Sequence, residues 1–259
     1  MGKKSLLRKI IRWGFEEHSL LAWGTFGLAW QALSWVFPIP SAWKILSLVW
    51  SNLTNPGFQT ALGESLLRML IGYFGVIVFG IGLGVLIGRY RWLDNVLGTV
   101  GAALNAMPGA AWVPLAVFLF GLTQKAVIFT IVLGATGIVM VNTGSGMKHV
   151  DPLMMRAART MGARGLKIFF YVIVPAAIPK ILDGLRLAWA FGWRALMAGE
   201  LLISSVHGMG QLLNDVAKKR DIEQLLAFMV IIGIIGAFVD AFVFNKLIQD
   251  RVRARWGTA

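Results

Sequence analysis

The chain alternates between long apolar runs and short polar segments that hold most of its charge. Apolar runs of about 20 residues allow a helix to cross roughly 30 Å of hydrocarbon. They lack the alternation of a lipid-facing strand, so only helices are expected. The pattern therefore predicts an all-α membrane protein with about six transmembrane helices. The expected spans are Leu20–Phe37, Leu66–Ile87, Val96–Phe120, Ala126–Ser145, Phe170–Leu202 and Ile222–Leu247.

The composition agrees with a bilayer as the solvent. Hydrophobic residues make up 57% of the chain and charged residues 14%, whereas a soluble domain carries about 25% charged residues. The net charge of +13 would suggest nucleic acid in a soluble protein. Here, basic residues at cytoplasmic span ends and beside anionic lipids explain it more simply, so membrane lipids are expected partners and nucleic acid is not. The chain has no cysteine, which excludes disulfides and thiolate metal sites.

The distribution of lysine and arginine sets the orientation. With the N-terminus inside, most basic residues fall on the cytoplasmic side and only a few, Arg68 among them, on the outer side, which predicts cytoplasmic termini. We interpret residues 1–19 as a cytoplasmic basic segment, 20–247 as one transmembrane domain and 248–259 as a cytoplasmic basic tail. The first apolar run lacks a clear small-x-small cleavage site, which favours a retained span over a signal peptide.

The loop at about residues 146–169 contains the signals of a short cytosolic helix. Asp151 can cap free backbone N–H groups, and Pro152 fits the first helical position. Gly162 can adopt the positive φ that ends a helix. Ala157 and Ala158 are small, so the surface of another protein can approach the backbone closely. The alternative is an ordinary basic loop that only obeys the positive-inside rule.

The order and spacing of several motifs resemble the permease subunits of ABC importers, within the nitrate, sulfonate, taurine and bicarbonate group. Ala157-Ala158, Gly162 and Pro175 resemble the family's "EAA" coupling loop. Arg156 replaces the family's Glu there, which implies a compensating acid on the partner or a contact that does not use this side chain. Val174 replaces the family's Leu before the proline. The other matching segments are SLLRMLIG (65–72), GVLIGR (84–89), MPGAAWVPL (107–115), LFGL (119–122), GLRLA (184–188) and AGELL (198–202).

The resemblance implies a type I ABC importer-like fold and a permease function. The chain would form the pathway for a small, anionic or sulfonate-like solute, driven by ATP hydrolysis on a partner. It implies two cytosolic ATPase subunits that hold the ATP and Mg²⁺, a second permease copy in a homodimer, a periplasmic or lipid-anchored solute-binding protein, and a bacterial inner membrane. The implied ATPase-coupling residues are Arg156, Ala157, Ala158, Arg159, Gly162 and Ala163.

Charged side chains within the fifth span are costly in a bilayer and are therefore functional candidates. Arg194 is the strongest candidate to meet an anionic substrate, and Glu200 is a second pathway candidate. A structural pairing of Arg194 with Glu200 is the alternative. Asp183 and Arg186 lie three residues apart on one helix face and can pair. Asp240 in the last span can neutralise one of these cations or cap a contact between helices.

Proline and glycine interrupt the third span around Trp112, itself a candidate for the substrate pathway. Pro108 and Pro114 free backbone groups that can line a cavity, and Pro175 frees a carbonyl in the fifth span. The three prolines are candidate gates or hinges, with a packing kink as the alternative. The glycines of the second span favour close helix packing rather than substrate contact; they are Gly72, Gly75, Gly80, Gly82, Gly84 and Gly88.

Two other functions fit the sequence less well. A stand-alone secondary transporter or channel would need no ATPase, and it would give the helix at Ala157 no role. A membrane enzyme would need a convergent catalytic set, but the three histidines are far apart, so no catalytic or metal cluster is expected. The chain also lacks the G-x-x-x-x-G-K-[ST] motif that cradles phosphates. No enzymatic activity and no cofactor are therefore expected on this chain.

Overall fold

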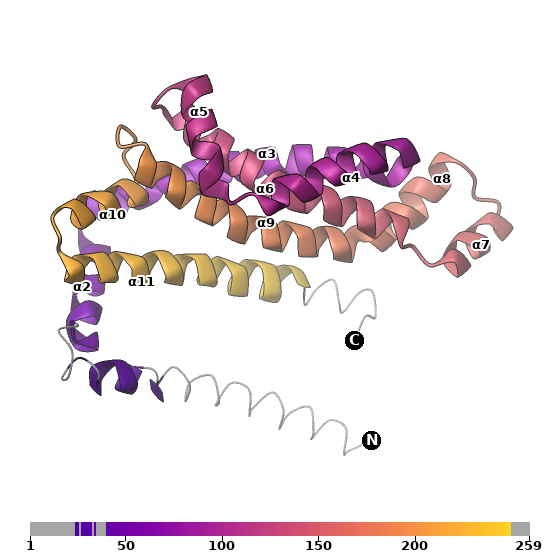
Figure 1. Ribbon diagram of the computed structural model, residues 1–259. Coiled ribbons are helices and arrows are strands. Elements are labelled where there is room, and N and C mark those ends of the chain that lie inside the picture. The colour runs from indigo at the N-terminus through magenta and orange to yellow at the C-terminus, as the bar shows by residue number, and fades with distance from the viewer. Residues whose placement is uncertain (1–23, 26, 33, 35–39, 250–259) are drawn as a thin grey trace, which may run out of the picture.

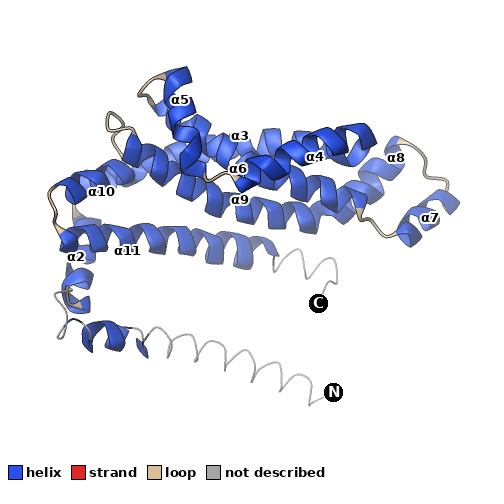
Figure 2. Ribbon diagram, in the orientation of Figure 1, coloured by secondary structure: helices blue, strands red, loops and turns tan. Residues whose placement is uncertain are grey.

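The computed structural model describes residues 24–25, 27–32, 34 and 40–249, which form helices and contain no strand (Figure 2). In chain order the elements from residue 42 are α2 (Ala42–Thr54), α3 (Pro56–Arg89), α4 (Arg91–Ala106), η1 (Gly109–Trp112), α5 (Val113–Phe120), α6 (Gln124–Lys148), α7 (Pro152–Thr160), α8 (Leu166–Ile168), η2 (Phe169–Ile173), α9 (Val174–Leu202), α10 (Met209–Lys218), α11 (Ile222–Val239) and η3 (Asp240–Gln249).

Most of the expected spans correspond to these helices. Within the described part, four helices are long and apolar enough to cross a membrane, or up to five if the bent pair α4 and α5 forms one span. Half of the first expected span, Leu20–Phe37, and all of the segment 1–19 lie outside the described residues, as does nearly all of 248–259. The second span is longer than expected, because α3 begins at Pro56 and has 34 residues.

Helix α6 is the centre of the bundle and packs between α3, α4 and α9 (Figure 1). Glycines on α3 allow this close approach. A Cβ at Gly72 would lie 2.8 Å from Ile131, one at Gly80 2.6 Å from Val139, and one at Gly84 2.5 Å from Thr143. The expectation that these glycines serve packing is confirmed at these positions, whereas a Cβ at Gly82 would meet nothing within 4 Å.

The third expected span is broken in the middle. Helix α4 ends at Ala106, and the axis turns by 105° before η1 and α5, so that α5 projects from the bundle (Figure 1). Pro108 stands at the break in an extended conformation. The interruption expected there is confirmed. Its physical cause is that a proline disfavours helical geometry in the residue before it.

The molecule has two distinct ends (Figure 1). Helices α7 and α8 lie at one end, called the α7 end here, and α2 and α10 lie at the other, the α10 end. Ser41 caps α2, accepting a hydrogen bond from the backbone N–H of Lys44 at 3.3 Å. An ion pair of 2.5 Å between Lys44 and Glu223 joins α2 to α11.

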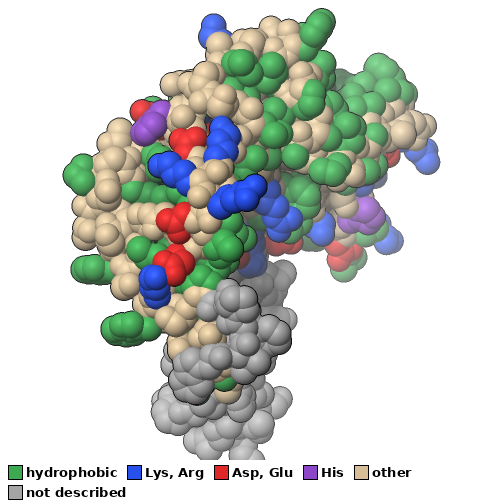
Figure 3. Space-filling view, turned by 60° about the vertical axis from the view of Figure 1, so that its left-hand side comes forward, with side chains coloured by type: hydrophobic (Ala, Val, Ile, Leu, Met, Phe, Trp, Pro, Cys, Tyr) green, Lys and Arg blue, Asp and Glu red, His purple; other side chains and the backbone are tan. Residues whose placement is uncertain are grey.

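Helix α11 lies alongside α9 (Figure 1). The indole N–H of Trp193 donates to the carbonyl of Ile232 at 3.3 Å, and both Trp189 and Trp193 are buried in the main core cluster. In a view that brings the α10 end forward, charged side chains gather in one band, with hydrophobic side chains spread over the adjoining surface (Figure 3). A surface with so many exposed apolar side chains fits a bilayer.

Candidate functional site

Helix α7 has the local structure expected from its sequence. The carboxylate of Asp151 accepts a hydrogen bond from the backbone N–H of Leu153 at 2.7 Å, and a proline occupies the first turn. Gly162 has a φ of +85°, a region that side-chain-bearing residues avoid. The backbone N–H of Ala163 donates a hydrogen bond of 2.9 Å to the carbonyl of Ala158. Both ends of this nine-residue helix are therefore set by local chemistry.

None of the residues of α7 is buried. Arg156 and Arg159 are exposed and form no ion pair with any residue that the structure describes. The structure brings the six expected coupling residues together on α7 and the turn after it, at the tip of the α7 end (Figure 1).

Sequence reasoning missed the apolar part of this surface. Leu153 is 66% exposed and Met161 is 87% exposed. They lie eight residues apart, two turns along the helix and its C-terminal turn, with Ala157 midway between them. That i, i+4, i+8 spacing was a detectable signal of an amphipathic helix. The surface therefore offers methionine and arginine, two residue types enriched at protein contacts, beside the small side chains of Ala157 and Ala158.

A second polar feature runs along α9. Lys180, Asp183 and Arg194 are exposed on this helix, while its opposite face buries small residues against α6. A Cβ at Gly184 would lie 2.7 Å from Asn142 of α6, which shows how close the two helices are. Because the glycine and alanine face of α9 is used for packing, its charged residues remain on the open face. We call Asn142, Lys180, Asp183, Arg186, Arg194 and Asp240 the charged seam.

One strong ion pair holds the seam together. The guanidinium of Arg186 donates two hydrogen bonds of 2.7 Å to the carboxylate of Asp240, joining α9 to η3. The expectation that Asp240 neutralises a cation of the fifth span is confirmed. Paired in this fork geometry, Arg186 and Asp240 largely cancel each other's charge.

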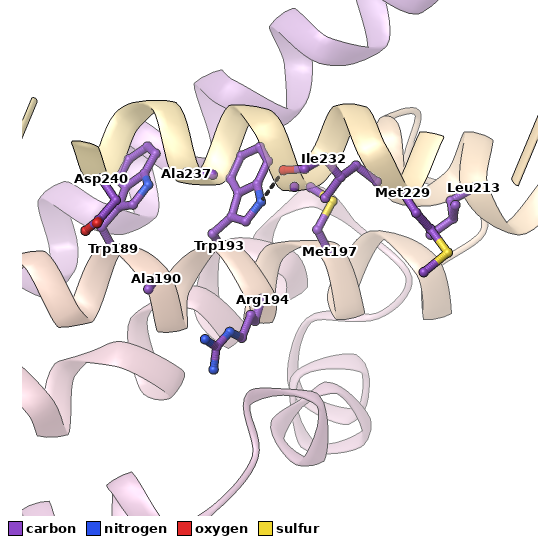
Figure 4. Close-up of a pocket in the computed structure, with 12 residues that line it drawn as sticks. Trp189, Ala190, Trp193, Arg194, Met197, Leu213, Met229, Ile232, Ala237 and Asp240 are labelled. Carbon is purple, nitrogen blue, oxygen red and sulfur yellow. Dashed lines mark hydrogen bonds between the residues drawn. The ribbon is translucent and has the colours of Figure 1, made fainter. Parts of the chain in front are cut away.

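Two hollows lie along the seam and share Ala190 and Asp240 among their lining residues. The first, of about 500 Å³, lies between α9 and α11 (Figure 4). The second, of about 490 Å³, is lined by Asn142, Lys180 and other seam residues. Arg194 borders the first hollow, and its guanidinium lies 5.3 Å from the ring of Phe191.

Glu200 lies in a different place from Arg194. It is fully buried and forms an ion pair with Arg68 of α3, which is 3% exposed. Ser65 donates to both carboxylate oxygens at 2.7 and 2.9 Å, and the N–H of Gly210 donates at 3.0 Å. The alternative pairing of Arg194 with Glu200 is therefore wrong. A pathway role for Glu200 stays a prediction, and the geometry favours a structural one.

The same network fixes the segment that leads into α10. Arg68 also donates to the carbonyl of His207 and, at 2.8 Å, to Glu64. A Cβ at Gly208 would lie 2.6 Å from the carboxylate of Glu200, so only glycine fits there. The network therefore connects α3, α9 and α10 at the α10 end.

The remaining expected residues are dispersed. Pro108, Trp112 and Pro114 surround the bend between α4 and α5, and the indole nitrogen of Trp112 is buried without a hydrogen-bond partner in the described part of the chain. Pro175 is the second residue of α9, which follows the π-helical turn η2. The structure does not group these residues with Arg194, and their roles as gate, hinge or pathway stay predictions.

Comparison with known proteins decides the family. Residues 77–254 match the family described as binding-protein-dependent transport system inner membrane component. The chain belongs to this family. A putative ABC transporter permease of Methanocaldococcus jannaschii is 34% identical over 231 residues, covering 86% of this chain and 85% of the relative. This permease is thus a multi-pass membrane protein, as its apolar helices indicate.

Relatives of the permease include proteins named for the transport of nitrate, taurine and bicarbonate. The nitrate import permease of a Synechocystis strain is 29% identical, covering 79% of this chain and 78% of the relative. The taurine transport permease of Escherichia coli is 28% identical and covers 88% of each chain. The bicarbonate transport permease of Synechococcus elongatus is 31% identical, covering 69% of this chain and 64% of the relative. The resemblance inferred from the motifs is confirmed.

A solved structure supports the fold. A chain of the MetNI methionine ABC transporter, solved in inward-facing conformations, superimposes with a TM-score of 0.59, covering 76% of this permease and 95% of that chain. Its sequence identity is 17%, so this likeness shows a shared fold and nothing more.

Proposed function

We propose that this permease forms half of a homodimeric importer that moves a small, anionic or sulfonate-like solute and is driven by ATP hydrolysis on two cytosolic ATPase subunits. The observation that carries the proposal is α7. It is a capped helix with no buried residue, and it stands at the tip of one end of the molecule (Figure 1). A helix that contributes nothing to the core of its own chain is best explained by a partner.

The chemistry of α7 indicates how the ATPase would bind. Ala157 and Ala158 let a groove close on the backbone, and Leu153 and Met161 supply the apolar contact area. Arg156 and the neighbouring basic residues favour a groove with acidic side chains, because a cation buried in a contact needs a partner. ATP and Mg²⁺ belong to the ATPase, and this chain contributes the docking helix.

The pathway would follow the charged seam. Charged side chains on a membrane-spanning helix face protein or water rather than lipid. The exposed side of the seam on α9 can therefore border another protein chain and a water-filled path. A second copy facing this side would enclose the path, with Arg194 as a binding group for the anion. The solute-binding protein would deliver the solute at the α10 end, and the α7 end and both termini would be cytoplasmic.

Motion at α7 has a direct route to the seam. The α7 loop connects the end of α6 to α8 and, through it, to α9. Helix α6 carries Asn142 of the seam, and α9 carries Arg194. The π-helical turn η2 and Pro175 lie where α9 begins. Closure of the ATPase dimer on ATP binding would therefore tilt α6 and α9 and alternate access to the seam, in the manner of rocking bundles.

The experiment is a pull-down of a co-expressed ATPase subunit from detergent. Ala158→Glu places a bulky acid in the expected contact, and Gly162→Val forces a β-branched residue to a φ of +85°. Both variants are expected to lose the ATPase while eluting as folded protein. Lys125→Glu, an exposed charge change far from α7 in the fold, is the control and should retain it. Equal capture by all variants, or no capture by wild type, would favour a stand-alone transporter.

A further inference from the structure

Helix α2 runs across the ends of the long helices rather than along them (Figure 1). It packs against α11 and α3. The side-chain amide of Gln224 in α11 donates a hydrogen bond of 2.7 Å to the side-chain oxygen of Asn52, and both Asn52 and Ile45 are buried. Because the long helices are the candidate spans, a helix that crosses their ends lies along the surface of the bilayer.

The exposed part of α2 is divided into two stripes. Four apolar side chains at alternating spacings of three and four residues form the apolar stripe: Trp43, Leu46, Trp50 and Leu53. Four polar side chains, each one position later, form the polar stripe: Lys44, Ser47, Ser51 and Thr54. Successive residues of a helix lie about 100° apart around its axis, so the two stripes are neighbours and the buried side completes the circle. The helix therefore presents one face to the protein, one to an apolar phase and one to a polar phase.

The apolar stripe continues onto the surface of α11. A hollow of about 430 Å³ is lined by Leu46 of the stripe together with Val230 and Ile234 of α11, and none of its described lining residues is charged. Ile234 is exposed on a helix that is long and apolar enough to span a membrane. An exposed apolar surface shared by a span and a surface helix indicates that lipid covers both. Trp43 and Trp50, which are 79% and 72% exposed, are of the residue type enriched where headgroups meet hydrocarbon.

We propose that α2 is an interfacial anchor, which lies in the headgroup region of the leaflet at the α10 end with its apolar stripe in the acyl chains and its polar stripe in water. Amphipathic helices of this kind bury their apolar face about 5–10 Å into the boundary between headgroups and acyl chains. Lys44 joins α2 to α11 through its ion pair with Glu223, and Asn55 directly after α2 caps α3. The depth of α2 therefore sets where both spans meet the membrane surface. This role does not depend on which solute the permease carries.

The test places one spin label at a time on either stripe of the full-length permease, in vesicles of phosphatidylethanolamine and phosphatidylglycerol. The chain has no cysteine, so each single-cysteine variant carries a single nitroxide. Leu46→Cys and Leu53→Cys report on the apolar stripe, and Ser47→Cys and Ser51→Cys are the matched controls on the polar stripe. All four positions are exposed, so the labels disturb no packing. Collision rates are measured with oxygen, which concentrates in hydrocarbon, and with a neutral nickel chelate, which concentrates in water and is present on both sides of the bilayer.

We expect the labels at Leu46 and Leu53 to collide more often with oxygen than with the nickel chelate, and the labels at Ser47 and Ser51 to show the reverse. The inference is overturned if the chelate reaches all four labels equally, because α2 would then lie in water. It is also overturned if neither reagent reaches Leu46 and Leu53, because a second copy or another protein would then cover the apolar stripe.

Discussion

The buried ion pair between Arg68 and Glu200 gives the most specific stability prediction. In Arg68→Leu the carboxylate of Glu200, fully buried, would keep its hydrogen bonds from Ser65 and Gly210 and lose its only cation in the described part of the chain. Breaking a buried ion pair from one side costs about 3–5 kcal/mol. At about 2–4 °C per kcal/mol for a chain of this size, the apparent Tm should fall by about 6–20 °C.

The double variant Arg68→Leu with Glu200→Leu separates the uncompensated charge from lost packing. It removes both charges and keeps apolar volume, so it should be more stable than Arg68→Leu alone. Tryptophan fluorescence, or size-exclusion chromatography after heating, would measure the apparent Tm of the single and the double variant in detergent. Lys125 is an exposed cation, so the control variant Lys125→Leu should have a Tm within about 2 °C of the wild-type value by the same conversion. The reasoning is refuted if Arg68→Leu behaves like this control, or if the double variant is the less stable of the two.

Three further predictions concern packing, capping and the seam. Gly84→Ala should cost about 1–3 kcal/mol of stability by overpacking, because its Cβ would lie 2.5 Å from Thr143 and 2.8 Å from the carbonyl of Met140. Gly82→Ala should be neutral or stabilising. Thermal unfolding of the two variants checks this prediction, and equal Tm values would contradict it. Asp151→Ala should destabilise α7 by about 1 kcal/mol, seen as faster hydrogen exchange over residues 152–160 and weaker ATPase capture, and unchanged exchange would show that the cap is unimportant. Arg186→Lys should lose the two-pronged contact with Asp240 and speed exchange over residues 240–244, an effect that should be absent in Lys180→Arg, which keeps the charge elsewhere on the seam.

Local signals in the sequence determined much of the architecture. Apolar length alone located α3, α6, α9 and α11, because a helix must satisfy its own backbone groups in a bilayer. Asp151 and Gly162 located the two ends of α7, since caps depend on a few neighbouring residues. The break near Pro108 followed from proline geometry in the same way. These features needed no knowledge of distant contacts.

Charge pairing was decided by the tertiary structure. Spacing along one helix suggested Arg186 with Asp183 and Arg194 with Glu200. The hydrogen bonds of Arg186 go to Asp240, 54 residues away, and Glu200 pairs with Arg68, 132 residues away. A one-dimensional pattern shows only neighbours on the same helix, while a buried carboxylate pairs with the nearest cation that packing brings to it. For the same reason, the hollow beside Arg194 could not be foreseen.

The sequence by itself thus determined a helical membrane permease with a capped, exposed helix at one end, because apolar length, caps and motif order are local properties of the chain. Only the tertiary structure decided which charged groups stabilise the fold and which remain open along the seam. The glycine and alanine faces of α3 and α9 fix how closely each helix approaches α6. That approach buries Glu200 with Arg68 and leaves Arg194 at the edge of an apolar hollow.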